Sequence, residues 1–433
     1  MALYARTIIS SSPTTLLQQL SFHVKQFADS PIIYSISPAP GLPPKALSKI
    51  VSSFTSLHDA VGCLSAPFVL PSAIQKPSLH SSGVTSCSFV VFDPSRAVTF
   101  RSTLPGKETA QVGRWHAGRK ASQPPRTDVI DPDVSSDIWE QLKSRSHELP
   151  LELQNSSSVF DTVLYISDGA PEGISQALST LRSATKLGFL ATSTPFITGR
   201  PFTLFRNSAV YSSGAVGISL HAPEVPKVDI QLPALTALTP ASKVTSSGGN
   251  LIHTIDNSNP SAMLLRAISE HELMKGKAFN VEFRTSHFYV GEVSGSANDI
   301  KPHRIYRITS GDPGRGTISL EGNEAPAVGS LVQMFYVETN DPSRPRPVIA
   351  SANDTISLNF FTVPSETEEV YEAPASFDAD RILRVSEDCI VIRDAFLAAS
   401  EHACIVSRLD HSGESAETPW KMALPEAHVR LHW

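Results

Sequence analysis

The stretch that decides the fold begins as VFDTVLYISDGAPEG at residues 159–173. After a helical run it continues as LGFLATSTPFITGRPFTLFRNSAVYSSGAVGISL at residues 187–220. This order predicts a strand, a Gly/Pro turn, a helix, a second strand and a hairpin. Small polar residues stand where the predicted strands end, which is where α/β proteins hold small ligands. The stretch therefore predicts an α/β fold with a ligand site at its strand ends.

An earlier segment repeats this order of elements. Ile32–Ser37 predicts a strand, and apolar residues at helical spacing follow it between Leu47 and Leu57. Ala60–Ser65 predicts the next buried strand. Val163–Ser167 corresponds to Ile32–Ser37, and Leu190–Ser193 corresponds to Gly62–Ser65. We interpret the N-terminal half as a duplicated strand–helix–strand unit.

The expected fold class is mixed α and β, with this duplicated N-terminal half and a β-rich C-terminal half. Residues 1–222 are expected to form an α/β domain, in which residues 98–104 pair back on the strand at residues 88–92 as a hairpin. Four prolines punctuate residues 223–248, which predicts a linker. Residues 249–433 predict one helix followed mainly by strands and form the second expected domain.

The composition indicates a soluble protein. The chain has 433 residues, of which 41% are hydrophobic and 18% are charged. No segment approaches the roughly 18 consecutive apolar residues of a membrane-spanning helix. The formal net charge of −6 argues against a nucleic-acid-binding protein, which needs a concentrated basic face. A cytoplasmic location is expected.

The N-terminus allows a second location. Residues 1–28 contain no acidic residue and are rich in Ser and Thr, which is typical of a mitochondrial transit peptide. Apolar residues at helical spacing between Leu16 and Phe27 instead favour a folded helix, and Thr15 with Gln18 would form its capping box. We expect the folded helix and keep mitochondrial import as the alternative.

The cysteines predict neither a disulfide framework nor a metal site. No pair of them has the C-x-x-C spacing, and His402 and His411 near Cys404 match no closed zinc site. We expect buried, reduced thiols, no metal and no cofactor. The four residues are Cys63, Cys87, Cys389 and Cys404.

Several segments together resemble the FIST family of sensory proteins. Residues 61–65, VGCLS, are similar to the family's Gly-Cys-Ser strand end, and residues 163–169 are similar to its second strand with a terminal Ser-Asp. Residues 212–217 are similar to its Gly-Ala-Val-Gly strand. Residues 243–250 and 260–262 are similar to the passage into the family's C-terminal domain.

The resemblance extends from about Thr14 to about residue 400 and implies one domain of the family's N-terminal type and one of its C-terminal type. It implies a signal-transduction module that binds a small ligand, with amino acids as the suggested ligands, and no established reaction. The sequence shows no recognisable F-box, so an adaptor for ubiquitin ligases is not implied.

The candidate ligand site consists of strand ends and the turns that follow them. Ser167–Gly169 joins a strand to a helix start, where free N–H groups favour an anion such as a carboxylate. Asp168 would instead cap those groups or hold a ligand's amino group. Arg200 or Arg315 would bind a carboxylate through two hydrogen bonds. The candidate residues are Gly62, Cys63, Ser65, Ser167, Asp168, Gly169, Thr192, Ser193, Arg200 and Arg315.

These residues are compatible with three functions. The leading hypothesis is a FIST-like sensor or scaffold that binds a small polar molecule such as an amino acid, without catalysis, and contacts neither membranes nor nucleic acids. The first alternative is a hydrolase or transferase with Cys63 or Ser193 as nucleophile and a histidine from the C-terminal half. No G-x-S-x-G, H-E-x-x-H or G-x-x-x-x-G-K-[ST] motif supports it. The second alternative is a protein-interaction module related to the F-box FIST adaptors.

Overall fold

The protein is a mostly β structure. In the computed structural model, 48% of the described residues lie in strands and 19% in helices. The expectation of a mixed α/β fold class is therefore wrong. The described residues are 2–69, 83–104, 106, 148–154, 160–221, 225–233, 235–270, 288–294, 301–312, 314, 316–322, 324–337, 356–363, 371–372, 379–407 and 418–433.

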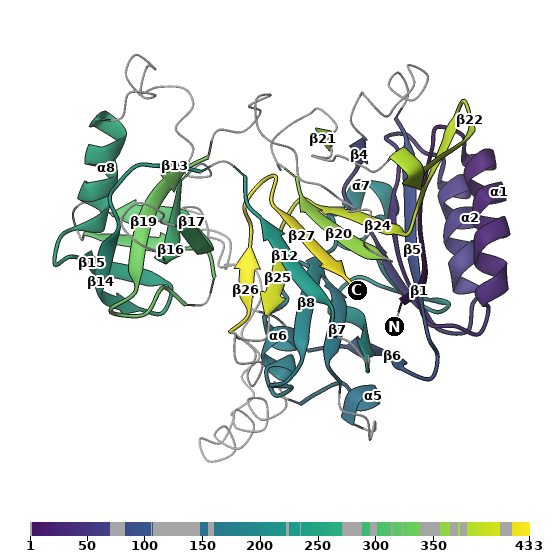
Figure 1. Cartoon of the computed structure of the whole chain (residues 1–433), viewed down its shortest axis with the longest axis horizontal. Helices are drawn as coiled ribbons and strands as arrows, with labels where there is room; N and C mark the ends of the chain where they lie inside the picture. Colours follow the sequence, from purple (N-terminus) through teal and green to yellow (C-terminus); the bar gives the residue numbers. More distant parts are fainter. Residues whose placement is uncertain are drawn as a thin grey trace, which may run out of the picture.

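An eight-stranded sheet forms one side of the molecule, with helices α1 (Pro13–Val24) and α2 (Pro44–Thr55) on its outer face (Figure 1). A short 3-10 helix, η1 (Lys25–Phe27), follows α1. In spatial order the strands are β10 (Ala209–Tyr211), β9 (Leu204–Arg206), β3 (Ala60–Leu64), β2 (Ile32–Ser37), β5 (Thr85–Phe92), β1 (Ala2–Ser10), β23 (Cys389–Arg393) and β22 (Ile382–Ser386).

A six-stranded sheet lies opposite, with α5 (Leu151–Gln154) and α6 (Glu172–Leu178) packed on its outer face. Its strands are β26 (Trp420–Met422), β25 (Cys404–Ser407), β8 (Thr185–Leu190), β7 (Thr162–Ser167), β11 (Ala215–Leu220) and β6 (Ala97–Ser102). The short helix α7 (Pro195–Thr198) follows β8. The inner faces of the two large sheets contribute to one apolar core.

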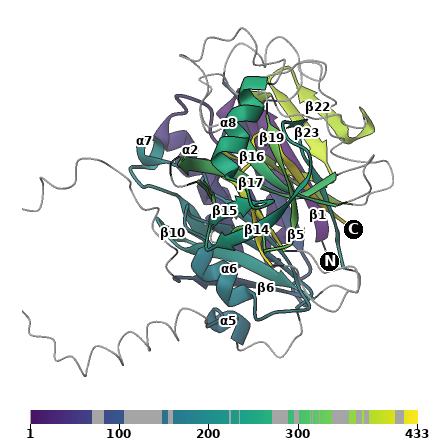
Figure 2. The ribbon, with the colours of Figure 1, turned by 90° about the vertical axis from the view of Figure 1, so that its left-hand side faces the viewer.

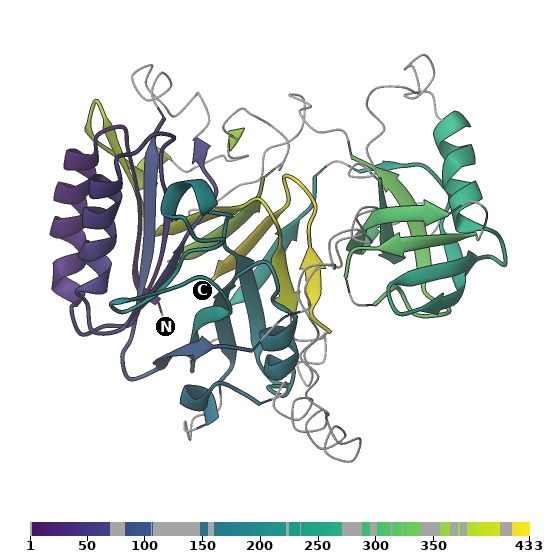
Figure 3. The ribbon, with the colours of Figure 1, turned by 180° about the vertical axis from the view of Figure 1, so that it is seen from behind.

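A four-stranded sheet completes this core. It contains β12 (Lys227–Gln231), β27 (His428–His432), β20 (Ser357–Thr362) and β24 (Ala395–Ser400). Its edge strand β24 packs on β1, β2 and β5 of the eight-stranded sheet. A two-stranded pair of β4 (Phe68–Val69) and β21 (Tyr371–Glu372) is separate from these sheets, and the turn η5 (Ala379–Arg381) precedes β22. The two chain ends lie close together (Figure 3).

A closed six-stranded barrel forms the other end of the molecule, with α8 (Pro260–Glu270) packed on it (Figures 1 and 2). Pairing of β16 with β19 closes it, and β13 (Thr236–Ala237) adds to β19 outside the ring. Around the ring the strands are β19 (Leu331–Tyr336), β14 (Ser242–Gly248), β15 (Leu251–Ile255), β18 (Thr317–Leu320), β17 (Lys301–Asp312) and β16 (Phe288–Ser294).

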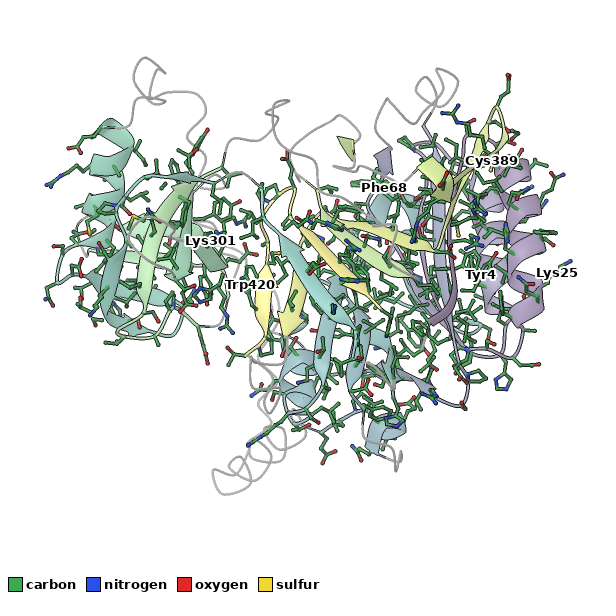
Figure 4. The ribbon with its side chains drawn as sticks, viewed as in Figure 1. Tyr4, Lys25, Phe68, Lys301, Cys389 and Trp420 are labelled. Carbon is green, nitrogen blue, oxygen red and sulfur yellow. The ribbon has the colours of Figure 1, made fainter. Side chains whose placement is uncertain are left out.

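Trp420 joins the barrel to the six-stranded sheet. Its indole N–H donates a hydrogen bond to the Ile305 carbonyl of β17, with a distance of 2.9 Å. Figure 4 shows Trp420 between β26 and the barrel. Lys421 and Arg307 also bind the two oxygens of Glu321, at 3.2 Å and 2.8 Å. Polar contacts from β26 thus fasten the barrel to the rest of the protein.

The two repeated strand–helix–strand segments are present as local units. β2 pairs in parallel with β3, and β7 in parallel with β8. In the first pair Tyr34 lies opposite Gly62, and in the second Tyr165 lies opposite Gly188. Gly62 therefore corresponds to Gly188, so the sequence alignment of residues 62–65 with residues 190–193 is shifted by two positions.

The expected hairpin of residues 88–92 with residues 98–104 does not form. β5 pairs with β1 and β2 in the eight-stranded sheet, whereas β6 pairs with β11 in the six-stranded sheet. The turn at Asp93–Ser95 is thus a corner between two sheets. A short turn between two apolar strands does not reveal whether they pair with each other or pass into different layers.

Chain segments on either side of the expected domain boundaries share the same sheets. Residues 223–248, expected as a linker, contain β12, β13 and β14. The C-terminal strand β23 pairs with β1, and β25 pairs with β8. Two large sheets therefore combine strands from both ends of the chain.

Residues near the N-terminus belong to the folded body. β1 lies between β5 and β23, and Leu16, Leu20 and Val24 of α1 are buried. The helix cap is Ser12, whose Oγ accepts a hydrogen bond from the Thr15 N–H at 3.3 Å, and not the expected box that begins at Thr15. None of the described helices is both long and apolar enough to cross a lipid bilayer.

Candidate functional site

The structure brings the ends of three predicted strands together. The Thr192 N–H, just after β8, donates to the Leu64 carbonyl at the end of β3, with a distance of 3.3 Å. The Ala191 N–H donates to the Ser167 carbonyl at 2.8 Å. The C-terminal ends of β3, β7 and β8 therefore meet where the two large sheets approach each other.

Gly62 and Cys63 of β3 are packed against neighbouring groups. A β carbon at Gly62 would lie 2.6 Å from the Tyr34 carbonyl oxygen, so this glycine provides room for Tyr34. Cys63 is fully buried in the same apolar cluster as Ile166 and Ala191. Burial raises the pKa of the Cys63 thiol to about 12, so the thiol is protonated at neutral pH and is a weak nucleophile.

The turn after β7 is held by its own carboxylate. Asp168 accepts hydrogen bonds from the Ala170 N–H at 2.9 Å and from the Gly214 N–H at 2.6 Å. Ser167 is buried beside it, whereas Gly169 is exposed and lies against the Phe202 ring. Because both oxygens of Asp168 serve to join this turn to the start of β11, the residue acts here as a structural cap.

Two further candidates lie at the surface. Ser193 is exposed, and its N–H donates to Glu401 Oε1 at 2.7 Å. Arg200 is exposed, and its guanidinium donates to Ser212 Oγ at 2.8 Å. Arg315 lies outside the described residues.

A histidine from the C-terminal half does lie near Ser193. The His402 ring contacts Phe202, with ring centroids 5.9 Å apart, and its Nε2 is 3.5 Å from Glu401 Oε1. Burial lowers the pKa of His402, which favours the neutral imidazole that a general base needs. Among the described contacts, however, the Ser193 hydroxyl makes no hydrogen bond to His402, and such a bond is the defining feature of an activated serine.

Sequence reasoning missed a group of hydroxyls on the inner face of the eight-stranded sheet. Strand alternation places Ser35 and Ser37 of β2 on this face together with Ile33, which belongs to the central core. Ile36 pairs with Leu64, so Ser37 and Ser65 follow side by side. We call the following residues the strand-end hydroxyl cluster: Thr7, Ser35, Ser37, Ser65, Ser86 and Ser88.

Three members of this cluster have no hydrogen-bond partner. They are Ser35, Ser37 and Ser65, and each is at most 2% exposed. For Ser35 the neighbouring group is the Cys63 thiol, a weak hydrogen-bond partner whose pKa this contact lowers against the larger effect of burial, so Ser35 has no strong acceptor. A buried hydroxyl without a partner costs about 1–3 kcal/mol relative to one that is satisfied. Three such groups at neighbouring positions are therefore an unusual feature of a folded protein.

The edge strand β24 covers the cluster and forms hydrogen bonds with one of its members, Thr7. Thr7 Oγ1 donates to the Ala395 carbonyl at 2.9 Å and accepts from the Leu397 N–H at 3.2 Å. At the other end of β24 the Ala66 N–H donates to the Ala399 carbonyl at 2.8 Å. Between these two anchors β24 packs on β2 and β5, the strands that contain Ser35 and Ser37 and Ser86 and Ser88.

A sequence signal for this cluster does exist. Ser35 and Ser37 occupy alternate positions of an otherwise apolar strand, and Ser86 and Ser88 do the same in β5. A period of two places such residues on one face of the sheet. Each segment therefore predicts a buried strand with hydroxyls on one face. The sequence does not show that the two strands are neighbours, which is what brings the hydroxyls together.

No protein-family model matches the sequence, and a search of curated proteins finds no match either. The resemblance to the FIST family therefore stays a prediction. Among the described residues, no three His, Cys, Asp or Glu side chains gather as a metal site would require.

Proposed function

We propose that this protein is a FIST-like sensor that binds a small polar molecule at the strand-end hydroxyl cluster. The observation that carries the proposal is the group of three buried serine hydroxyls without partners, Ser35, Ser37 and Ser65. They stand at the C-terminal ends of the parallel strands β2 and β3. A ligand that hydrogen-bonds to them would remove their desolvation cost.

The position of these serines supports a site more than scattered packing defects. Elsewhere in the described core, the Tyr34 hydroxyl on the opposite face of β2 has no partner, and neither have the buried hydroxyls of Thr162 and Ser219. Thr162 and Ser219 belong to different strands of the six-stranded sheet. Strand alternation places Thr162 on the inner face, with Leu164, and Ser219 on the outer face, with Ala215. Within the described part of the chain, unpartnered serine and threonine hydroxyls gather on one face only at the ends of β2 and β3.

The connection from β24 to the barrel supports a sensory function. β24 covers the cluster, β25 follows it in the chain, and β25 pairs with β26. Trp420 of β26 then binds the barrel through the Ile305 carbonyl. A change in how β24 packs on the cluster would therefore reach the barrel through two consecutive strands.

Thermal-shift screening tests the proposal. The panel contains the amino acids, which the family resemblance implies as ligands, together with uncharged polar compounds. A ligand that binds only the folded protein must raise the unfolding midpoint. We expect the shift to disappear in Ser65→Ala and to persist in Ser219→Ala, a matched control because Ser219 is equally buried and unpartnered.

The same experiment separates a ligand from bound water. Water satisfies a buried hydroxyl as well as a ligand does. If no compound shifts the midpoint and Ser65→Ala only alters the stability of the unliganded protein, the serines bind water and the proposal is wrong.

One observation favours the protein-interaction alternative. Phe196 is fully exposed and Ile197 is 44% exposed on α7, a turn that internal hydrogen bonds hold in place. Exposed aromatic side chains on rigid turns are common anchors of protein interfaces. In this case Phe196→Asp would abolish binding of a partner protein while every compound in the panel fails to shift the midpoint.

A further inference from the structure

The strand-end hydroxyl cluster contains no charged group. Its members present only hydroxyls, and the adjacent Cys63 thiol is neutral because burial raises its pKa to about 12. In the described part of the chain, the buried charged or titratable side chains other than cysteine and tyrosine are Asp168, Lys186, His428 and Arg430. None of these four lies on β1, β2, β3, β5 or β24, which form the cluster and its cover.

Asp168 and Arg200, the two charged residues expected to bind a ligand that lie in the described part of the chain, are engaged elsewhere. Both oxygens of Asp168 accept hydrogen bonds from the backbone N–H groups of Ala170 and Gly214. The exposed Arg200 binds Ser212 on the surface. Neither side chain is available as the counter-charge for an ion held against Ser35, Ser37 and Ser65.

Burial without a counter-charge selects against ions. Moving an ammonium or carboxylate group out of water costs several kcal/mol unless an opposite charge and hydrogen bonds replace the water. A serine hydroxyl offers one donor and two acceptor positions, which match groups that both donate and accept, such as the hydroxyls of a polyol. The site therefore suits an uncharged hydroxylated molecule better than a zwitterion.

The sheet lattice sets the size of this molecule. Ser37 and Ser65 stand on neighbouring strands, whose separation is about 4.8 Å, and Ser35 precedes Ser37 by two residues, or about 6.6 Å along the strand. A chain of three or four carbons spans these hydroxyls. We infer that the strand-end hydroxyl cluster binds a small uncharged polyol, an inference that rests on the proposed function and contrasts with the amino acids implied by the resemblance.

Three compounds of equal carbon number test this inference. Erythritol is an uncharged tetrol, threonate is an anion and threonine is a zwitterion, and each has four carbons. Binding to the full chain is measured by isothermal titration calorimetry, and saturation-transfer NMR detects weaker binding. We expect erythritol to bind with an affinity that is the same at low and at high salt, because no ion pair contributes.

Variants locate the binding site. Ser37→Ala and Ser65→Ala should each weaken erythritol binding about two- to tenfold, the range expected for the loss of one neutral hydrogen bond. Ser219→Ala should leave it unchanged, and the variants' unfolding curves establish that they fold.

The outcomes distinguish this inference from the proposed function. If threonine or threonate binds, Ser65→Ala weakens that binding and erythritol does not bind, the ligand is charged and the inference is wrong while the proposed function stands. If neither these compounds nor the thermal-shift panel binds, both are wrong. If erythritol binds equally to wild type, Ser37→Ala and Ser65→Ala, it binds elsewhere and the inference is also wrong.

Discussion

The ring of Tyr34 covers Gly62 on the neighbouring parallel strand. A β carbon at Gly62 would lie 2.6 Å from the Tyr34 carbonyl oxygen and 2.7 Å from two ring carbons. The ring is stacked in turn on Phe54 of α2, with centroids 4.2 Å apart. The second unit repeats this relationship, since a β carbon at Gly188 would clash with Tyr165 Cζ. The Tyr165 hydroxyl lies 2.8 Å from Ser175 Oγ of α6, so in both units an aromatic ring over a glycine joins strand to helix.

Gly62→Ala and Gly188→Ala should each lower the free energy of unfolding by about 1–3 kcal/mol, because the added methyl group forces a packed tyrosine to move. Urea denaturation measures this change. Gly248→Ala is the control, since the nearest atom to its β carbon would be His253 Nε2 at 3.4 Å. Equal stabilities of Gly62→Ala and Gly248→Ala would show that the Tyr34 contact is not tight.

Asp168→Ala should lower the free energy of unfolding by about 1–3 kcal/mol, because it removes the acceptor of the Ala170 and Gly214 N–H groups. The exposed Asp29, replaced by Ala, provides the control. The thermal shift produced by a ligand of the hydroxyl cluster should be the same in Asp168→Ala as in the wild type. Loss of that shift would instead place the ligand at Asp168.

Cys63 should resist alkylation in the native protein. Its thiol is fully buried, and burial raises its pKa to about 12, so very little thiolate forms at pH 8. Iodoacetamide followed by peptide mass spectrometry should find Cys63 unmodified without denaturant and fully modified in urea. Rapid modification of native Cys63 would revive its role as a nucleophile.

The free energy of unfolding should decrease as the pH falls, because His428 is buried in its neutral form. Its Nε2 is 3.0 Å from Asn359 Oδ1, its ring is stacked on Phe361, and burial lowers its pKa to about 3. The unfolded chain binds a proton below its ordinary pKa of about 6.5 and the folded chain does not. The contribution of neutral His428 to the free energy of unfolding is therefore complete above pH 6.5. It declines by up to about 1.4 kcal/mol per pH unit between pH 6.5 and pH 3.

Urea denaturation at pH 7.5 and pH 5 measures the effect of His428. His428→Gln should reduce the difference in unfolding free energy between the two pH values, and replacement of the exposed His303 by Gln should not. An unchanged pH dependence in His428→Gln would mean that this histidine is protonated in the folded protein.

Local elements could be predicted from the sequence where periodicity is strong. The stripe of Leu47, Ile50 and Phe54 predicted α2, and all three residues are buried. Alternation or apolar runs predicted β2, β3 and β7. Their partners could not be predicted, because periodicity shows which face of a strand is buried and not which strand lies beside it. The corner between β5 and β6 and the closure of the barrel depend on that missing information.

The candidate site was predictable only in part. Ser65 was named from a strand end, whereas Ser35 and Ser37 lay in a predicted strand and received no role. Their significance depends on the absence of hydrogen-bond partners, which only three-dimensional contacts reveal. Asp168 acts as a cap and not as a ligand contact, because backbone N–H groups from two segments bind its carboxylate.

The pairing of β1 with β23 has a consequence for synthesis on the ribosome. Ile8 is synthesised well before its cross-strand neighbour Val391, which follows it by 383 residues. Until then one edge of β1 exposes unpaired backbone groups, which attract other extended chains. Such late closure of a distant contact slows folding and prolongs the time during which this edge is open to aggregation.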